Sequence, residues 1–295
     1  MLRDQLKGTG VALITPFNDE HQVDYDSLLK LIDYDLKNGV EYLVILGTTG
    51  ETPVLSMQEK TDIINFTVQY VNGLVPIVVG VGGNHTSAVI KELELLPLDK
   101  ITAILSASPY YSKPSQEGLF QHYKAVSDAS PKPLILYNVP SRTGRNLEAS
   151  TVVRLASEVD NIAGIKEAGG DFQQCLAILK DKPSDFLVVS GDDALALPQL
   201  ACGMDGVISV VANCFPKVFS EMVRCCLKGD FKNAKGYNDE LLESYSFLFE
   251  ENNPAGVKAV LSELGIIRNN LRLPLVPLSS GVHEKVKRFL AKLDA

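Results

Sequence analysis

The sequence predicts an α/β protein: a (β/α)8 barrel followed by a C-terminal helical extension. First, eight short apolar runs of strand character alternate with eight segments of helical periodicity. This alternation implies parallel strands joined by right-handed crossovers, and eight units over roughly 225 residues favour a closed barrel over an open sheet. Second, the rest of the chain carries helical patterns only. We therefore expect a barrel over residues 1–228 and a helical extension over residues 229–295.

The eight expected strands are nearly continuous apolar runs, which is the pattern of parallel strands buried on both faces. Turn or polar residues follow most of them, so their ends are well marked. The strands are expected at Gly10–Thr15, Tyr42–Leu46, Val75–Gly80, Ile101–Ser106, Leu134–Tyr137, Ile162–Lys166, Phe186–Ser190 and Gly206–Val210.

The expected helices show apolar residues at helical spacing between start and stop signals. Asp24 or Asp26 is placed to cap the first long helix, Asp24–Asn38, and Gly39 ends it. Ser56 and Glu59 form a capping box at the start of the second. This helix and the later ones are expected at Met57–Val71, Thr86–Leu96, Gln116–Ala129, Ala149–Glu158, Phe172–Lys180, Ala194–Ala201, Lys217–Leu227, Ala234–Phe249, Pro254–Leu264 and His283–Leu293.

The composition narrows the class of protein. The chain has 295 residues, of which 45% are hydrophobic and 22% charged, with a net charge of −8. An acidic chain without basic runs is a poor candidate for binding nucleic acid or an anionic membrane. The five cysteines are scattered without paired spacing, which argues against a disulfide framework or a zinc site. No stretch has the length of a membrane span or the pattern of a signal peptide, so we expect a cytoplasmic protein.

Polar residues gather after the expected strands, at the end where barrels carry their functional sites. The strand starts are bland by comparison. A purely structural scaffold would not require this asymmetry, so it predicts a binding or catalytic site. The residues concerned are Gly47–Glu51, Gly80–Asn84, Ser108–Tyr111, Tyr137–Gly144, Lys166–Glu167 and Gly191–Asp193.

Lys166 is the most informative of these residues because it closes an apolar strand and precedes a Gly-Gly turn. Burying an ammonium group costs several kcal/mol unless the group is paired or loses its proton. A neutral lysine amine can attack a ketone and form a Schiff base. The alternatives are a surface lysine at a strand edge or an ion-pair partner of Glu167.

The other groups also have structural alternatives. The segment Gly47–Gly50 is either a tight turn or an anion site made of backbone N–H groups and threonine hydroxyls. Tyr137 could be a buried strand tyrosine, and Arg142 is either a surface charge or a carboxylate clamp. Asp192 and Asp193 could cap a helix or hold a loop.

Cofactor and metal motifs have little support. The glycines from Gly80 onward resemble a dinucleotide fingerprint only superficially, because His85 stands where its last glycine belongs. The four histidines are isolated in sequence, so neither a histidine-based triad nor a metal site is favoured. We expect metal-independent chemistry.

Taken together, Lys166 and the motifs GTTGE, SPYY and YNVPSRTG resemble the dihydrodipicolinate synthase family of the pyruvate-dependent class I aldolases. The resemblance runs from about Gly8 to the C-terminal helices. It implies a (β/α)8 barrel with a C-terminal extension, assembled as a homotetramer of two tight dimers. The implied reaction joins pyruvate to L-aspartate 4-semialdehyde in the diaminopimelate route to lysine, through a lysine–pyruvate imine and without a cofactor.

The resemblance implies catalytic roles for four residues. Lys166 matches the Schiff-base lysine, and Tyr137 matches the tyrosine that relays protons. Thr48 matches the hydroxyl that links this tyrosine to a second one. Tyr111 matches that second tyrosine, which the family supplies from the neighbouring subunit.

It also implies substrate contacts. Thr49 matches the residue that grips the pyruvate carboxylate, and Arg142 matches the arginine that receives the carboxylate of the semialdehyde. Gly191 and Ile208 match positions whose backbone lines the pocket. Arg142 favours this synthase over an N-acetylneuraminate lyase or a 2-keto-3-deoxy sugar acid aldolase on the same barrel. Those two activities, and a non-catalytic binding protein, are the alternatives.

Many members of the family are inhibited by lysine at a dimer interface. The matching positions here are Thr52, Pro53, Asn84 and Tyr110, with two departures. Lys60 stands where lysine-sensitive relatives carry a histidine, and Ala88 stands where they carry a glutamate. A cation repels a cationic effector and alanine cannot receive its ammonium group. We therefore expect weak or absent inhibition, unless Glu92 compensates.

Overall fold

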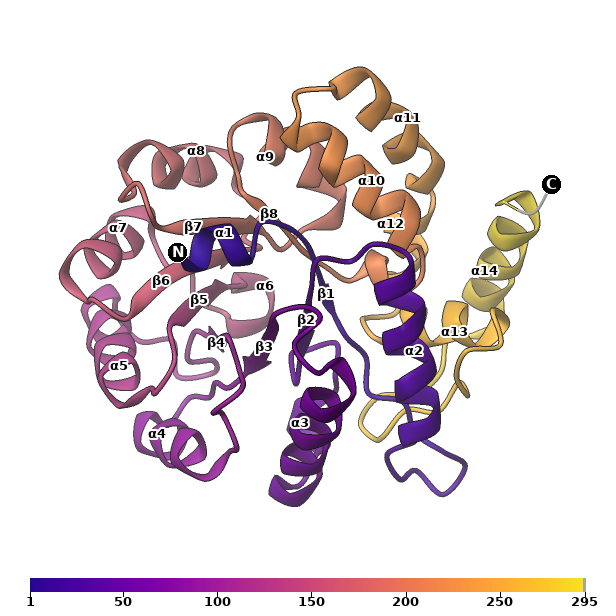
Figure 1. Ribbon diagram of the computed structural model, residues 1–295, viewed down its shortest axis with the longest axis horizontal. Helices are drawn as coiled ribbons and strands as arrows, with labels where there is room; N and C mark the ends of the chain where they lie inside the picture. The colour runs from indigo at the N-terminus through magenta and orange to yellow at the C-terminus, as the bar shows by residue number, and fades with distance from the viewer. Residues whose placement is uncertain (294–295) are drawn as a thin grey trace.

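Residues 1–293 are described by a computed structural model, and they form a closed barrel of eight parallel strands in sequence order (Figure 1). Each strand pairs with the next, and β1 pairs with β8 to close the barrel. The predicted (β/α)8 barrel is therefore confirmed. The strands are β1 (Gly8–Ala12), β2 (Tyr42–Ile45), β3 (Ile77–Gly80), β4 (Ala103–Ala107), β5 (Leu134–Asn138), β6 (Ile162–Glu167), β7 (Leu187–Ser190) and β8 (Gly206–Ser209).

Eight principal helices surround the barrel, and their start signals work as expected. Asp24 caps α2 by accepting the Ser27 N–H at 3.0 Å. The capping box of α3 is complete, because Ser56 and Glu59 each accept the other's backbone N–H. The helices are α2 (Tyr25–Lys37), α3 (Met57–Val71), α4 (Thr86–Leu95), α5 (Gln116–Ala129), α7 (Ala149–Glu158), α8 (Phe172–Asp181), α9 (Ala196–Ala201) and α10 (Pro216–Leu227).

Several short helical elements lie outside the predicted pattern. They span only three or four residues, which is too few for a periodic signal. One of them, α6, begins with a proline and ends at Gly144 in the left-handed region, both of which suit helix ends. The short elements are α1 (Leu2–Gln5), η1 (Thr52–Val54), α6 (Pro140–Thr143), η2 (Asp193–Leu195) and η3 (Val211–Asn213).

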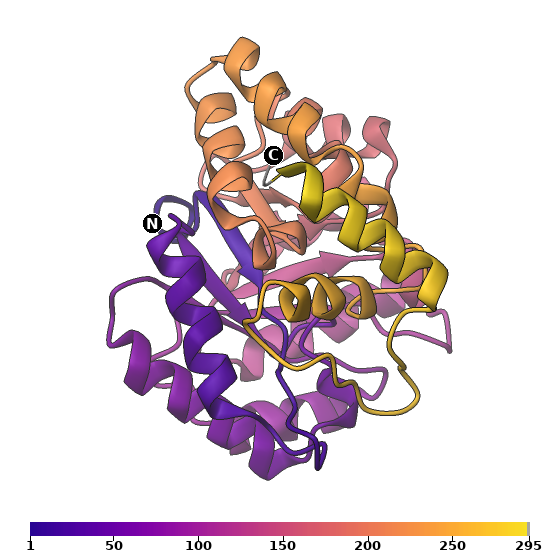
Figure 2. The same ribbon diagram turned by 90° about the vertical axis from the view of Figure 1, so that its right-hand side faces the viewer.

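The C-terminal extension contains α11 (Phe231–Leu241), α12 (Ser244–Phe247), α13 (Ala255–Glu263) and α14 (Ser280–Leu293). It packs along one side of the barrel, with α11 against α10 and α14 against α12 and α13 (Figures 1 and 2). The single helix expected over Ala234–Phe249 is wrong. The buried Ser244 hydroxyl donates to the Leu241 carbonyl at 2.6 Å, and such a local bond competes with the helical ladder where the helix breaks.

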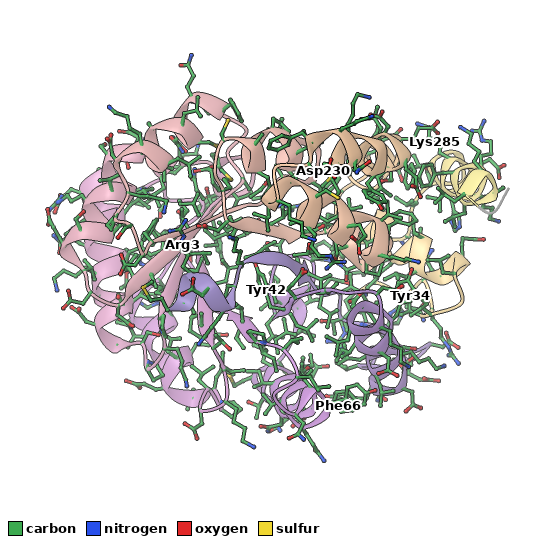
Figure 3. All side chains as sticks on the ribbon, turned by 45° about the horizontal axis from the view of Figure 1, so that its top comes forward. Arg3, Tyr34, Tyr42, Phe66, Asp230 and Lys285 are labelled. Carbon is green, nitrogen blue, oxygen red and sulfur yellow. The ribbon has the colours of Figure 1, made fainter. Side chains whose placement is uncertain are left out.

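The amino-terminal end of the barrel is closed by side chains. Arg3 of α1 forms an ion pair with the buried Asp205 at 2.8 Å and donates to the Ser184 carbonyl at 2.6 Å. Tyr42 packs its ring over β1 so closely that a β-carbon at Gly10 would lie 2.1 Å from the ring. Figure 3 labels Arg3 and Tyr42 among the side chains at this end. Access to the barrel is therefore from its other end.

Across residues 1–293, no helix has both the length and the apolar character needed to cross a membrane.

Candidate active site

A cavity of about 320 Å³, here called the central cavity, lies at the carboxyl ends of the strands. Its walls come from the barrel and from the extension, so segments far apart in sequence meet there. The barrel contributes Thr48, Thr49, Tyr137, Arg142, Lys166, Gly191, Asp192, Asp193 and Val210, among others, and the extension contributes Tyr245, Phe249 and Asn253. Most of the residues singled out in the sequence are thus brought to one place.

Lys166 and Tyr137 occupy paired positions on the neighbouring strands β6 and β5. The Lys166 side chain is buried in the cavity wall, and its Nζ lies 4.5 Å from the centroid of the Tyr137 ring. Among the described residues, no carboxylate forms an ion pair with Lys166. An amine beside a phenol ring, without a carboxylate partner, is well placed to react with a substrate in the cavity.

Glu167 is engaged away from this amine, because successive strand residues point to opposite faces. Its two carboxylate oxygens accept hydrogen bonds from Asn138 Nδ2, both at 3.0 Å. Gln174 Nε2 donates at 3.0 Å and the Gly169 N–H at 2.6 Å. Burial raises the pKa of Glu167 in spite of these donors. The alternative in which Glu167 pairs with Lys166 is therefore wrong.

Asp193 is a functional candidate that the sequence interpretation treated only as a helix cap or loop anchor. Asp192 is the residue that caps, since it accepts the Ala194 N–H at 3.1 Å. Asp193 is buried and accepts the N–H groups of Val210 and Val211, at 3.0 and 3.1 Å. Burial raises its pKa to about 6, while hydrogen bonds and the charge of Lys166 oppose the rise. Asp193 thus brings a buried carboxylate near the amine.

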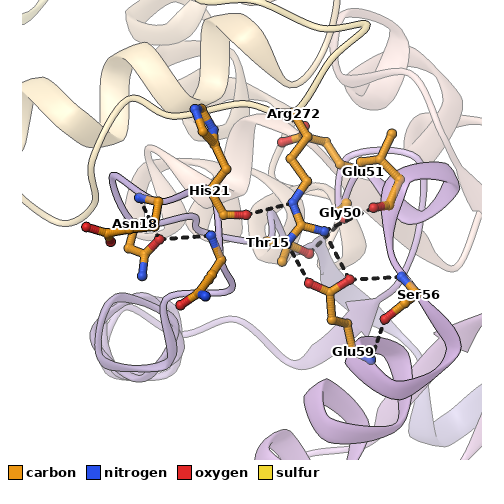
Figure 4. Close-up of polar contacts among 11 residues, drawn as sticks. Thr15, Asn18, His21, Gly50, Glu51, Ser56, Glu59 and Arg272 are labelled. Atoms are coloured by element: carbon orange, nitrogen blue, oxygen red, sulfur yellow. Dashed lines mark hydrogen bonds and ion pairs between the residues drawn. The ribbon is translucent and has the colours of Figure 1, made fainter.

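The loop after β2 carries Thr48 and Thr49 and is held in a tight conformation. Leu46 and Glu51 bracket it with φ angles of 55° and 53°, in the left-handed region that side chains other than glycine rarely adopt. Thr15 Oγ1 donates to the Gly50 carbonyl at 2.7 Å, as drawn in Figure 4. Such strain persists only where surrounding contacts fix the backbone.

The extension supplies several of those contacts. Lys258 of α13 is fully buried and forms an ion pair with Glu51. The Arg272 N–H donates to the Glu51 carboxylate at 3.1 Å, and the Arg272 guanidinium binds Glu59 of α3 (Figure 4). Asn253 Nδ2 donates to Thr49 Oγ1 at 2.8 Å. The loop is therefore held between the barrel and the extension.

Arg142 lies at the mouth of the central cavity on α6. Its Nη2 donates to Asn252 Oδ1 of the extension at 3.1 Å. This hydrogen bond leaves the other guanidinium donors available for a carboxylate entering from solvent.

Two predicted site residues are not part of the central cavity. Tyr111 is 89% exposed, with a φ of 70°, and lies in the loop between β4 and α5. Ile208 is buried within β8 and does not line the cavity, where Val210 takes the place on this strand.

A second cavity of about 450 Å³ adjoins the first and shares Thr48, Tyr137 and Arg142 with it. Four of the predicted effector residues line this second cavity, namely Thr52, Pro53, Lys60 and Tyr110. Asn84 and Ala88 are exposed and do not line it. Within it, Lys60 Nζ forms an ion pair with Glu92 at 2.7 Å, both side chains being largely buried.

No group of three or more His, Cys, Asp or Glu side chains in residues 1–293 is arranged to hold a metal ion.

The fold and the cavity define a class of protein: a (β/α)8 barrel enzyme with a buried lysine at the end of its sixth strand. The sequence matches the Dihydrodipicolinate synthetase family over residues 5–293, and the chain belongs to that family. This confirms the resemblance noted in the sequence.

Individual relatives agree closely in length. The 4-hydroxy-tetrahydrodipicolinate synthase of Parabacteroides distasonis is 50% identical over 289 residues, which cover 98% of this chain and 97% of that protein. The same enzyme from Phocaeicola vulgatus is 50% identical over 293 residues, covering 99% of each chain. The crystal structure of the chloride-inhibited dihydrodipicolinate synthase of Acinetobacter baumannii, complexed with pyruvate, has a TM-score of 0.95 at 40% identity, covering 98% of this chain and 99% of that one. The expectation of a lyase is confirmed, and the synthase is favoured over the two alternative barrel activities.

Proposed function

We propose that the chain condenses pyruvate with L-aspartate 4-semialdehyde to form 4-hydroxy-tetrahydrodipicolinate, through a Schiff base on Lys166. The observation that carries this proposal is the buried Lys166 amine, which faces the central cavity beside the Tyr137 ring and has no ion-pair partner within residues 1–293. Membership of the family supports it, as does the pyruvate complex of the Acinetobacter baumannii relative.

The first half of the reaction activates pyruvate. The neutral Lys166 amine adds to the ketone carbon, and loss of water gives an imine. The protonated imine withdraws electrons, so a methyl proton leaves and an enamine forms. In this scheme Tyr137 gives and takes these protons, and Thr48, which lines the same cavity, links it to a further hydroxyl. Thr49 faces the same cavity and receives the pyruvate carboxylate.

The second half forms the new carbon–carbon bond. The enamine carbon attacks the aldehyde carbon, and the aldehyde oxygen takes up a proton. The amine of the semialdehyde then attacks the imine carbon, closes the ring and releases the lysine amine. Arg142 stands at the cavity mouth, where it can hold the carboxylate of this second substrate.

We further propose that the protein works as a homotetramer, a dimer of dimers, in which Tyr111 enters the site of a neighbouring copy. Tyr111 is 89% exposed on its own chain, and a partner subunit would bury this aromatic surface. In such an assembly, Tyr111 would complete the proton relay with Tyr137 and Thr48. An isolated chain would then hold an incomplete relay.

The second cavity would be the effector site, and we propose that it does not respond to lysine. An effector ammonium would need the Glu92 carboxylate as its partner, but this carboxylate is already paired with Lys60. A free lysine would have to break this pair and approach the Lys60 ammonium, both of which oppose binding.

The test of the proposed function is borohydride reduction in the presence of pyruvate, followed by peptide mass mapping. We expect a reduced pyruvate adduct on Lys166, and none in a Lys166→Ala variant. The variant Arg142→Ala should keep adduct formation and lose most of the condensation. A folded and assembled wild-type protein without an adduct on Lys166 would overturn the proposal, and equal loss of both activities in Arg142→Ala would remove the role given to that arginine.

A further inference from the structure

We infer that Asn253, on the extension, is a positioning residue that directs the Thr49 hydroxyl proton into the central cavity and so sets the affinity for a keto acid carboxylate. This inference rests on the proposed function, because the carboxylate concerned is that of pyruvate.

The direction of one hydrogen bond is the central observation. Asn253 Nδ2 donates to Thr49 Oγ1 at 2.8 Å, and both side chains are buried. A threonine hydroxyl has one proton and two lone pairs. Since Asn253 occupies a lone pair, the hydroxyl proton is left for another acceptor. Thr49 lines the central cavity, so an acceptor bound there can receive this proton.

An anionic substrate needs a donor and is repelled by a lone pair. A free hydroxyl can rotate to present either one. Asn253 removes this freedom, because it faces Thr49 with its Nδ2 group, which can only donate. The hydroxyl is therefore organised for an anion before the substrate binds, which lowers the cost of ordering it on binding.

The backbone that carries Asn253 is itself fixed by its surroundings. The Asn253 backbone N–H donates to Asn252 Oδ1 at 2.9 Å. Helix α13 follows directly, and its Lys258 forms the buried ion pair with Glu51 at the end of the Thr49 loop. Lys258 Nζ also donates to the Asn270 carbonyl at 2.9 Å. The extension thus holds the loop at two points, one of which sets the orientation of the hydroxyl.

A packing role for Asn253 makes a different prediction. If the side chain only fills space, Asn253→Asp should be mild, because the two side chains have the same shape, and Asn253→Ala should be worse. If the amide orients Thr49, the order reverses. An aspartate would accept the Thr49 proton and place a negative charge beside the substrate carboxylate.

The experiment measures pyruvate dependence in the assembled, full-length enzyme at pH 8. Wild type, Asn253→Ala and Asn253→Asp are compared for the pyruvate KM, kcat and borohydride trapping. Trapping is repeated with pyruvamide, in which a neutral amide replaces the carboxylate. Asn233→Asp serves as the matched control, because it makes the same change at an exposed position of the extension.

We expect the pyruvate KM to rise roughly 10-fold or more in Asn253→Asp, to rise less in Asn253→Ala, and to stay unchanged in Asn233→Asp. The kcat at saturating pyruvate should fall less than kcat/KM. The preference for pyruvate over pyruvamide should narrow in Asn253→Asp, an effect that a general structural defect would not produce. Circular dichroism and the assembled mass confirm that each variant is folded.

If Asn253→Asp fails to fold, a double-mutant cycle of Asn253→Ala with Thr49→Val decides. The double variant should be no worse for pyruvate than Thr49→Val alone. Three outcomes would each overturn the inference. The effects of the two substitutions could add, or the pyruvate KM could rise more in Asn253→Ala than in Asn253→Asp. The preference for pyruvate over pyruvamide could also stay unchanged in Asn253→Asp. Wild type without any reducible adduct would instead overturn the proposed function, and the inference would fall with it.

Discussion

The aliphatic stem of Lys166 lies directly against the backbone of Gly191. A β-carbon at Gly191 would sit 2.7 Å from Lys166 Cε and 3.0 Å from its Cγ. These separations are too short for carbon atoms in contact, so any side chain at position 191 must displace the lysine. The residue that directly follows strand β7 therefore limits where the Lys166 side chain can lie, although it carries no side chain of its own.

This contact makes Gly191→Ala a test of amine placement. We expect the rate of pyruvate adduct formation to fall roughly 10-fold or more, because overpacking forces the lysine from its rotamer. The measurement is the rate of borohydride-trapped adduct. Gly236→Ala is the control, because a β-carbon there meets nothing within 4 Å. It should preserve the rate and slightly stabilise α11. If Gly191→Ala forms the trapped adduct at the wild-type rate, the prediction is contradicted, because the amine then tolerates displacement.

Asp193 predicts a pH dependence. Burial raises the pKa of its carboxyl to about 6, so the group is ionised at pH 8 and takes up a proton as the pH falls through about 6. Its negative charge favours the protonated Schiff base on Lys166, so adduct yield should fall over this range. Asp193→Asn should reduce the adduct yield at pH 8 roughly 10-fold, and its yield should not fall further as the pH drops through about 6. A variant whose yield keeps the wild-type midpoint would assign the step to another group.

The Lys60–Glu92 pair predicts how the enzyme responds to lysine. Activity assayed with millimolar lysine should stay unchanged, since the ion pair occupies the second cavity. The variant Lys60→His removes the resident ammonium and frees the Glu92 carboxylate to accept a new one, so it should become sensitive to lysine. Strong inhibition of wild type would mean that Glu92 leaves Lys60 to receive the effector.

Asp35 predicts a stability effect at a site remote from the cavity. Its carboxyl is fully buried on α2, and neither oxygen has a hydrogen-bond partner among the described residues. Burial raises its pKa well above 3.8. The folded chain therefore keeps this proton where the unfolded chain loses it, and stability contributed by the group falls as the pH rises above about 4. Asp35→Asn should raise the free energy of unfolding at pH 8 by about 1–3 kcal/mol, and the melting temperature with it. Near pH 4 it should change either quantity little. A gain of equal size at both pH values would exclude ionisation as the cause.

Much of the fold could be predicted because local signals and global packing agree. The expected and observed ends of helix α3 agree to the residue, because its capping box lies directly before the periodic apolar residues. The break between α11 and α12 could not be foreseen, because it depends on the burial of Ser244. Elements of three or four residues, such as η2 and η3, carry no periodic signal at all.

The site was predictable where a motif marks it and unpredictable where a distant segment completes it. Lys166 and Tyr137 lie at the carboxyl ends of strands and Thr49 follows one, so the barrel places them together. Asn253 follows no strand and lies in the turn between α12 and α13, and only the three-dimensional packing brings it to Thr49. From the sequence, Glu92 could replace the glutamate missing at Ala88 as a partner for a lysine effector. Only the structure shows that Glu92 is paired with Lys60.

The ion pair between Glu51 and Lys258 has a consequence for protein synthesis. Glu51 emerges from the ribosome long before Lys258 is made. A carboxylate cannot be desolvated without its partner except at a cost of about 3–5 kcal/mol, so the loop after β2 has to wait in a hydrated state. The nascent chain can assemble strands and helices as it grows, yet the loop that carries Thr48 and Thr49 takes its final conformation only after Lys258 has been made.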